Sequence, residues 1–335
     1  MRRLAFPLLL ASALLGGEYD DLGFDVEAFE KKTFEADFLF RSDSRYLEKG
    51  SDANYQSRNE LNLKTVYQKE RFSLYADLSY HHVAQKERTA EDDEMINELY
   101  LRIGDEKNTF EAGKRALRWG KGYAYSPVAF FERPKDPVYP ERSKEGYLTA
   151  LAQMTRTTDS DILKNYSATI LGFPEDKVND PLFAQTDSHW GARLYALIFD
   201  TDIDIVLAEK STGIDLSTNL TTYLELHGEY AKKDERESHL IGISLETHYD
   251  IKLILESYTT FEEQDNRYLK LSQKEPFGLY YAAIYHLRME NLTSEQTTDQ
   301  TGLTYDFKNG WTVDAARLET TLGGVGGRVL VQWFY

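Results

Sequence analysis

Cysteine is absent from the 335 residues of this chain, and proline is scarce, at eight residues. The absence of cysteine excludes disulfides, thiolate metal sites and the cysteine that carries the lipid of a lipoprotein. Beyond residue 17 no apolar run approaches the ~20 residues that a membrane-spanning helix needs. Tyrosine (23) and phenylalanine (17) are plentiful, and this balance favours strands.

Basic residues are also in deficit, with 39 Lys and Arg against 56 Asp and Glu and a net charge of −17. Without Arg2 and Arg3, which lie in the N-terminal segment discussed next, 37 bases face the same 56 acids, a charge of about −19. Such a chain is a poor partner for nucleic acid. The acids have two interpretations: they keep loops and turns soluble, or they line a pore that favours cations.

Residues 1–17 have the pattern of a secretory signal peptide. Two arginines precede an apolar run, and Ala-Ser-Ala at 11–13 is a cleavage motif. A Gly-Gly pair at 16–17 offers a second point, so cleavage is expected between residues 13 and 17. The chain is therefore expected to be exported, with residues 18–335 forming one domain.

Segments of about ten residues alternate between apolar and polar side chains and are separated by polar turns. A period of two is typical of a strand with one apolar and one polar face. The apolar rows are Phe34, Ala36, Phe38 and Phe40; Phe72, Leu74, Ala76, Leu78 and Tyr80; Trp190, Ala192, Leu194, Ala196 and Ile198; Ile241, Ile243 and Leu245; and Leu279, Tyr281, Ala283, Tyr285 and Leu287. This period also fits a soluble β-sandwich. Aromatic residues at the ends of the rows favour a membrane barrel, whose interfacial girdles are aromatic.

The last alternating segment, residues 328–335, places Val329, Val331, Trp333 and Tyr335 on one face. The closing strand of an outer-membrane barrel shows apolar residues to lipid and an aromatic near the interface. This ending resembles the C-terminal signature that the barrel-assembly machinery of Gram-negative bacteria recognises. We therefore expect residues 328–335 to bind that machinery.

Tight and long connections alternate along the chain. Tight turns are expected at 68–71, 105–108, 200–202, 219–222, 248–250 and 308–310, and longer loops at 48–56, 85–93, 120–146, 174–188, 232–238 and 262–266. The alternation predicts an all-β, transmembrane antiparallel barrel of about 18 strands, with short periplasmic turns and longer extracellular loops. Sixteen strands is the alternative, because residues 267–273 fit a short strand or a loop. A barrel of this size leaves a water-filled lumen unless loops plug it.

The longest connection, residues 120–146, is the third of the extracellular loops. Ser126 and Pro127 are residues typical of a helix start, so a short helix is predicted over 128–133. At 27 residues the loop is long enough to be functional, and the Phe130–Phe131 pair needs a surface to pack on.

If this loop folds into the barrel, its charges form a constriction. Lys114, Arg115 and Arg118 would then face Glu132 and Asp136 across the opening, and opposed charges set the ion preference of a pore. The full set of constriction candidates is Lys114, Arg115, Arg118, Lys121, Glu132, Arg133 and Asp136. The alternative is a lid over the barrel mouth whose charges only interact with water.

Further acids lie on the polar faces of strands and are expected in the lumen. They either pair with neighbouring Lys and Arg or contribute to selectivity; they are Glu35, Asp37, Asp77, Glu98, Glu225, Glu229, Glu246 and Glu256. His227 is expected to be a solvated lumen residue rather than a metal ligand, because the seven histidines form no cluster. No G-x-S-x-G or H-E-x-x-H motif occurs, so we predict no enzyme activity, no cofactor and no metal.

The chain as a whole resembles the large porin-like barrels of Gram-negative outer membranes. Residues 118–128 (RWGKGYAYSPV) and 272–277 (SQKEPF) are similar to stretches that recur in a poorly characterised group of barrels from sulfur- and metal-metabolising proteobacteria, including Campylobacter relatives. The resemblance implies an outer-membrane barrel and assigns no substrate.

The predicted function is a porin-like channel for passive diffusion of small hydrophilic solutes or ions, with the loop 120–146 as its constriction. The acidic composition leaves a bias for cations open. The expected partners are outer-membrane lipids and lipopolysaccharide, and a homo-oligomer is left open. Some similar barrels occur with envelope lipid-transport components. The alternative function is therefore a barrel component of an export or lipid-transport system with periplasmic partners. A third interpretation is a structural barrel or surface receptor with a plugged lumen.

Overall fold

The computed structural model describes residues 33–86, 89–138, 145–174 and 189–335, and nearly all of their regular structure is β-strand. The strands are β1 (Thr33–Lys49), β2 (Asp52–Lys69), β3 (Phe72–Gln85), β4 (Glu91–Gly104), β5 (Asn108–Arg115), β6 (Tyr147–Thr157), β7 (Leu163–Gly172), β8 (Trp190–Ile198), β9 (Thr201–Ala208), β10 (Ser211–Asn219), β11 (Leu224–Lys233), β12 (Arg236–Glu246), β13 (Ile251–Thr259), β14 (Asp265–Lys274), β15 (Ala282–Asn291), β16 (Gln296–Asp306), β17 (Trp311–Thr320) and β18 (Gly324–Phe334). One turn of 3-10 helix, η2 (Pro276–Gly278), precedes β15. No helix in the described part of the chain is long and apolar enough to span a membrane.

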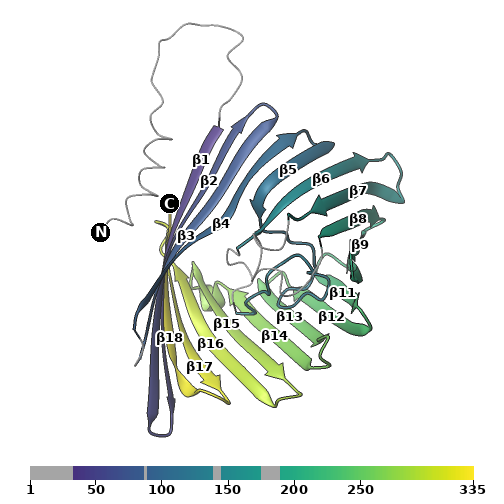
Figure 1. Ribbon diagram of the computed structural model, residues 1–335. Helices are drawn as coiled ribbons and strands as arrows, with labels where there is room; N and C mark the ends of the chain where they lie inside the picture. The colour runs from purple at the N-terminus through teal and green to yellow at the C-terminus, as the bar shows by residue number, and fades with distance from the viewer. Residues whose placement is uncertain (1–32, 87–88, 139–144, 175–188) are drawn as a thin grey trace, which may run out of the picture.

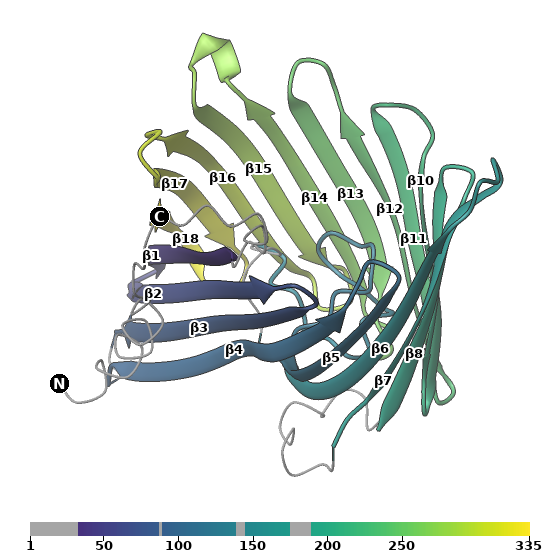
Figure 2. The same cartoon turned by 90° about the horizontal axis from the view of Figure 1, so that it is seen from above.

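The strands form one closed sheet (Figure 1, Figure 2). Each strand pairs antiparallel with its neighbours in sequence, and β1 pairs with β18 over ten residue pairs, from Leu39↔Phe334 to Glu48↔Val325. A closed sheet has no free edge, so the backbone groups of every strand find partners. The prediction of an 18-strand antiparallel barrel is confirmed, and residues 267–273 belong to a full strand, β14.

The connections lie alternately at the two ends of the barrel. At the terminal end, where β1 begins and β18 finishes, they are 70–71, 105–107, 158–162, 199–200, 220–223, 247–250, 275–281 and 307–310. At the opposite end, called here the loop end, they are 50–51, 86–90, 116–146, 173–189, 209–210, 234–235, 260–264, 292–295 and 321–323. The difference in length between the two ends therefore comes chiefly from 116–146 and 173–189.

Two of the loops predicted to be long are tight turns. In place of loops at 48–56 and 232–238, two-residue turns at 50–51 and 234–235 carry Gly50 and Asp234 with positive φ, at 63° and 54°. The polar residues assigned to the first loop continue β1 and β2, which are 17 and 18 residues long. Both strands exceed the ~9–11 residues that cross a membrane, so their polar ends were mistaken for loop.

Inward and outward rows follow the predicted alternation in most strands. On β3, Phe72 and Leu74 are exposed on the outer wall, while Ser73, Asp77 and Ser79 are buried on the inner wall. On β15 the predicted assignment is wrong. Tyr285 and Leu287 point inward, and His286 and Arg288 point outward, because Tyr285 bonds to the inward Asp314 and Leu287 lies in an inner apolar cluster. Inward positions can be apolar here because a loop covers them, as described next.

Candidate functional site

Residues 116–138 and 145–146, the described part of the connection between β5 and β6 and called here the inserted loop, run inside the ring of strands (Figure 1, Figure 2). Both ends of the loop are tied to β4. The backbone N–H of Ala116 donates to Glu98 at 2.9 Å, and that of Gly146 donates to the carbonyl of Asn97 at 2.8 Å. The loop therefore enters and leaves at one place on the wall and reaches across from there.

The predicted helix over 128–133 is not formed, and this part of the loop is a succession of turns. Ala129 N–H donates to Ser126 O at 3.3 Å and Glu132 N–H to Ala129 O at 3.2 Å, without a continuing helical ladder. The hydroxyl of Ser126 donates to Glu229 on β11 at 2.9 Å instead of capping a helix. A tertiary contact has overridden the local preference.

Glu229 binds the first turns of the inserted loop. Its carboxylate accepts hydrogen bonds from the backbone N–H of Gly122 at 2.6 Å and of Val128 at 3.2 Å, as well as from the hydroxyl of Ser126. Hydrogen bonds to an ionised acceptor are about twice as strong as neutral ones. This acid was expected to pair with a cation of a neighbouring strand or to tune selectivity, but it holds backbone.

Glu256 on β13 does the same for the adjacent residues. Its two oxygens accept the backbone N–H of Tyr123 and, at 2.9 Å, that of Ala124. Behind it His227 is buried, with Nε2 3.0 Å from Glu256. The prediction of a solvated His227 is thus wrong, since the loop covers this histidine.

Apolar side chains fix the inserted loop to the other strands that it crosses. Leu117, Trp119, Val128, Phe130 and Phe131 of the loop share one buried cluster with inward residues Leu151, Leu171, Val206, Ala208 and Ala231. A second cluster joins Ala124 to Ile254, Tyr268 and Leu287 of β13–β15. The inward faces of β6–β15, which the loop contacts in this way, are called here the covered wall.

Two glycines make room for the inserted loop on the covered wall. A Cβ on Gly191 of β8 would lie 2.4 Å from the ring of Phe131, and one on Gly213 of β10 would lie 2.7 Å from Val128. Both distances are below the contact limit for carbon atoms. The close approach of these loop side chains to the strand backbone therefore requires glycine.

The remaining inner wall, formed by β16–β18 and β1–β5, is polar and is called here the polar wall. Arg41 pairs with Glu60 at 3.0 Å, with both side chains less than a tenth exposed. Arg328 lies 3.2 Å from Asp43 and 3.4 Å from Asp314. On the polar wall, side chains of neighbouring strands therefore satisfy one another directly.

The residues predicted to form the constriction do not lie together in the structure. Lys114 lies on the outward row of β5 and pairs with Glu145 at 2.5 Å, and Arg133 pairs with the same carboxylate. Arg115 points inward and pairs with Glu111, while Arg118 is exposed. Lys114 and Arg133 thus share the carboxylate of Glu145, an arrangement that was not predicted.

Glu132 was predicted to face the bases across an opening. Glu132 is buried and accepts the backbone N–H of Trp119, so its carboxylate supports the loop and does not face an opening. Lys121 pairs with Asp204 of β9 at 3.2 Å. Asp136 accepts the N–H of Val138 at 2.9 Å and interacts electrostatically with Arg328 on the polar wall. The inserted loop therefore spans from β5 toward β18.

Two tyrosines of the inserted loop have a raised pKa. Burial against the covered wall raises the pKa of Tyr123 to about 12, and the nearby Glu225, which accepts its hydroxyl at 2.8 Å, adds to the effect. Burial likewise raises the pKa of Tyr125 to about 12. Both phenols of the docked loop are therefore neutral at physiological pH.

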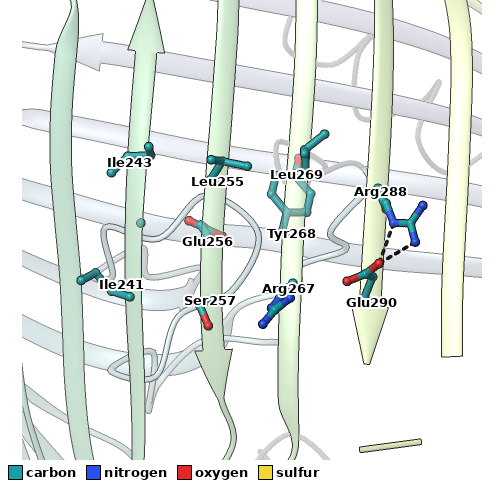
Figure 3. Close-up of a pocket in the computed structure, with 11 residues that line it drawn as sticks. Ile241, Ile243, Leu255, Glu256, Ser257, Arg267, Tyr268, Leu269, Arg288 and Glu290 are labelled. Carbon is teal, nitrogen blue, oxygen red and sulfur yellow. Dashed lines mark hydrogen bonds and ion pairs between the residues drawn. The ribbon is translucent and has the colours of Figure 1, made fainter. Parts of the chain in front are cut away.

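The outer wall carries a separate groove of about 570 Å³ across β12–β15 (Figure 3). Ile241, Ile243, Leu255 and Leu269 form its apolar part, and Arg288 at its edge bonds to Glu290 at 2.6 Å. This groove faces away from the inserted loop, so it is no part of the candidate lumen. Among the described residues, no group of three or more His, Asp or Glu side chains is arranged to hold a metal ion.

Comparison with known proteins identifies the fold. No protein-family model and no curated protein matches the sequence. Among solved structures, the chain is similar to a triple mutant of the Rhodopseudomonas blastica porin, with a TM-score of 0.54 and 12% identity over 90% of this chain and 100% of that one. A second mutant of the same porin gives a TM-score of 0.52 with the same identity and coverage. The fold is that of a porin barrel. Within this porin barrel, the inserted loop and the two walls bound the candidate lumen.

Proposed function

We propose that the chain is an outer-membrane channel through which small hydrophilic solutes or ions diffuse passively. The observation that carries this proposal is a closed barrel whose inward-facing cations remain in contact with water. The side chains of Arg45, Lys64 and Arg102 are 34%, 46% and 37% exposed. Passage of polar solutes needs such a wetted path, and the likeness to porins supports it.

The proposed orientation places the terminal end in the periplasm and the loop end outside a Gram-negative cell. The outward rows of β6–β13 are apolar and would contact lipid. Near the terminal end, Trp311 and Trp333 stack with ring centroids 5.9 Å apart, as expected for an aromatic girdle at a membrane interface. In this proposal residues 328–335 are the segment that barrel-assembly machinery recognises.

The inserted loop is the proposed constriction. Of the candidate residues, Arg115, Arg118, Lys121, Arg133 and Asp136 are the ones that a solute would meet, because each keeps some exposure to water. Lys114 and Glu132 instead support the loop through Glu145 and the backbone of Trp119. The discrimination would come from the width and charge of the passage and not from chemistry.

The alternative, a partner-dependent export or lipid-transport component, would need a lumen closed at rest or a lateral opening between strands. Ten consecutive residue pairs join β1 to β18, which speaks against an opening at that seam. The water-exposed inward cations speak for a passage that needs no partner. Both observations favour the diffusion channel.

Single-channel recording tests the proposal. Refolded protein lacking residues 1–17 should give steady conductance steps in a planar bilayer, and its heat-modifiable mobility on a gel should show that the barrel is folded. A folded barrel that stays silent would contradict the channel and would make the export component the better explanation.

A further inference from the structure

The acidic and basic side chains of the lumen differ in how far they are exposed to water. In five of its ion pairs the carboxylate is buried and the cation is partly exposed. The exposed fractions of the acid and base side chains are 3% and 34% for Asp43–Arg45, 7% and 46% for Asp77–Lys64, 4% and 37% for Glu111–Arg102, 0% and 23% for Asp204–Arg193, and 0% and 22% for Asp204–Lys121. Other pairs differ. Arg41–Glu60 and Arg328–Asp43 are buried on both sides. In Lys252–Glu246 and Arg236–Glu262, which lie toward the two ends of the barrel, the acid is the more exposed partner.

This inequality has a physical cause. Arg and Lys carry their charge at the end of a long apolar stem, which can lie along the wall while the charge reaches water. A carboxylate has a short stem and stays at the wall, where Glu229 and Glu256 are covered by the backbone that they bind. An acidic chain can therefore present a basic inner surface.

The inward-facing acids that keep partial exposure are already engaged. Glu98 accepts the N–H of Ala116, Asp202 accepts the hydroxyl of Tyr195, and Glu225 accepts the hydroxyls of Tyr123 and Ser217. Exposed acids of the inward rows, such as Glu35, Asp37 and Glu91, lie toward the two ends of the barrel. Water and salt screen rim charges over about 8 Å at physiological ionic strength.

A hollow of about 510 Å³ lies on the loop-end side of the inserted loop and shows the same bias. Four bases border it, namely Arg133, Lys135, Lys233 and Arg236. Its two acids are Glu132, which is buried against backbone, and Glu262, which pairs with Arg236 at 3.4 Å. A solute approaching the inserted loop from this end meets mainly positive charge.

We propose that this channel selects small anions over cations, with oxyanions such as carboxylates, phosphate and sulfate as its substrate class. The inference rests on the proposed channel function and reverses the cation preference that the composition predicts. Selection arises where the inserted loop narrows the lumen, because most charged side chains that stay exposed there are Arg and Lys, with Asp136 and Glu145 as the acidic exceptions. The acids instead hold the loop in place.

The test is the reversal potential of the refolded protein in a planar bilayer under a KCl gradient. We expect a potential of the sign that chloride permeation gives. A potential of the sign that potassium gives would overturn the anion proposal while leaving the channel intact. A folded barrel without conductance would overturn the channel itself, and the anion proposal with it.

The variant Arg118→Gln tests whether the ion selectivity arises at the inserted loop. Arg118 is exposed on the inserted loop, and the variant should lower the chloride-to-potassium permeability ratio by roughly two- to threefold, the size expected for one water-exposed unit charge. Arg317→Gln is the matched control, because it removes an exposed arginine of the outer wall and should leave the ratio unchanged. If Arg118→Gln loses its heat-modifiable mobility, Arg236→Gln at the hollow replaces it. If Arg317→Gln changed the permeability ratio as much as the inner-wall variant, the assignment of the selectivity to the inserted loop would be wrong.

Discussion

The covered wall and the polar wall are inner faces of one barrel, yet they stabilise it differently. On the covered wall, strand carboxylates such as Glu229 bind loop backbone, and inward apolar residues pack on loop rings. On the polar wall, neighbouring strands bind each other through pairs such as Arg41–Glu60. A change on the polar wall should therefore weaken the barrel, whereas a change on the covered wall should release the loop.

The largest effect on stability is expected for Arg41→Met. Glu60 would lose the partner that it holds at 3.0 Å in a buried position. Breaking a buried ion pair by removing one side costs about 3–5 kcal/mol, so the urea midpoint of refolded protein should fall clearly. The double variant Arg41→Met with Glu60→Leu is the control and should recover most of the loss. A failure of the double variant to recover would mean that the arginine acts through packing and not through its charge.

A smaller and more local effect is expected for Glu229→Leu. The backbone N–H groups of Gly122 and Val128 and the hydroxyl of Ser126 would lose their acceptor, which should weaken docking of the inserted loop by about 3 kcal/mol. Single-channel conductance should rise and become noisy, while the urea midpoint of the barrel changes little. Glu229→Gln keeps an acceptor oxygen and should lie between this variant and the parent. A lowered urea midpoint with unchanged conductance would show that Glu229 stabilises the barrel and does not hold the loop, which contradicts the difference between the two walls.

The smallest effect is expected from alkaline pH. The docked loop holds the pKa of Tyr123 and Tyr125 at about 12, against an ordinary value of 10.0. The released loop loses these protons first, so docking is unaffected below pH 10 and weakens as pH rises from 10 to 12. The tyrosinate absorbance and the conductance should change together in that range, and Tyr123→Phe should reduce the absorbance change. Ionisation of both tyrosines near pH 10 without a change in conductance would contradict burial of the two rings.

The strand count could be predicted because its signals are local. Turn residues and a period of two mark each strand, and they located turns such as 105–107 and 307–310 close to where the structure has them. Loop length was harder to predict. Polar residues that extend β1 and β2 beyond a membrane have the composition of a loop, and only the pairing of the two strands distinguishes them.

Which row of a strand faces the lumen could not be predicted from alternation alone. A row of apolar residues can face lipid or can face the inserted loop, and on β15 the second case holds for Leu287. A signal was available, because Leu151, Leu171 and Val206 are apolar residues in inward rows, and Gly191 and Gly213 open space beside them. These interruptions of the polar row mark where a loop packs. The anchoring roles of Glu229 and Glu256 required the contacts themselves.

The anchors of the inserted loop also order the steps of folding. Val128 binds Glu229 across 101 residues of sequence, and Tyr123 binds Glu256 across 133. Contacts between residues so distant in the chain form slowly, because the closure entropy of the intervening segment is lost before the contacts form. The loop is synthesised before its binding surface, and Phe130 and Phe131 stay uncovered until the later strands arrive. A chain that ends before β11 therefore carries the loop without the carboxylates of Glu229 and Glu256 that bind its backbone.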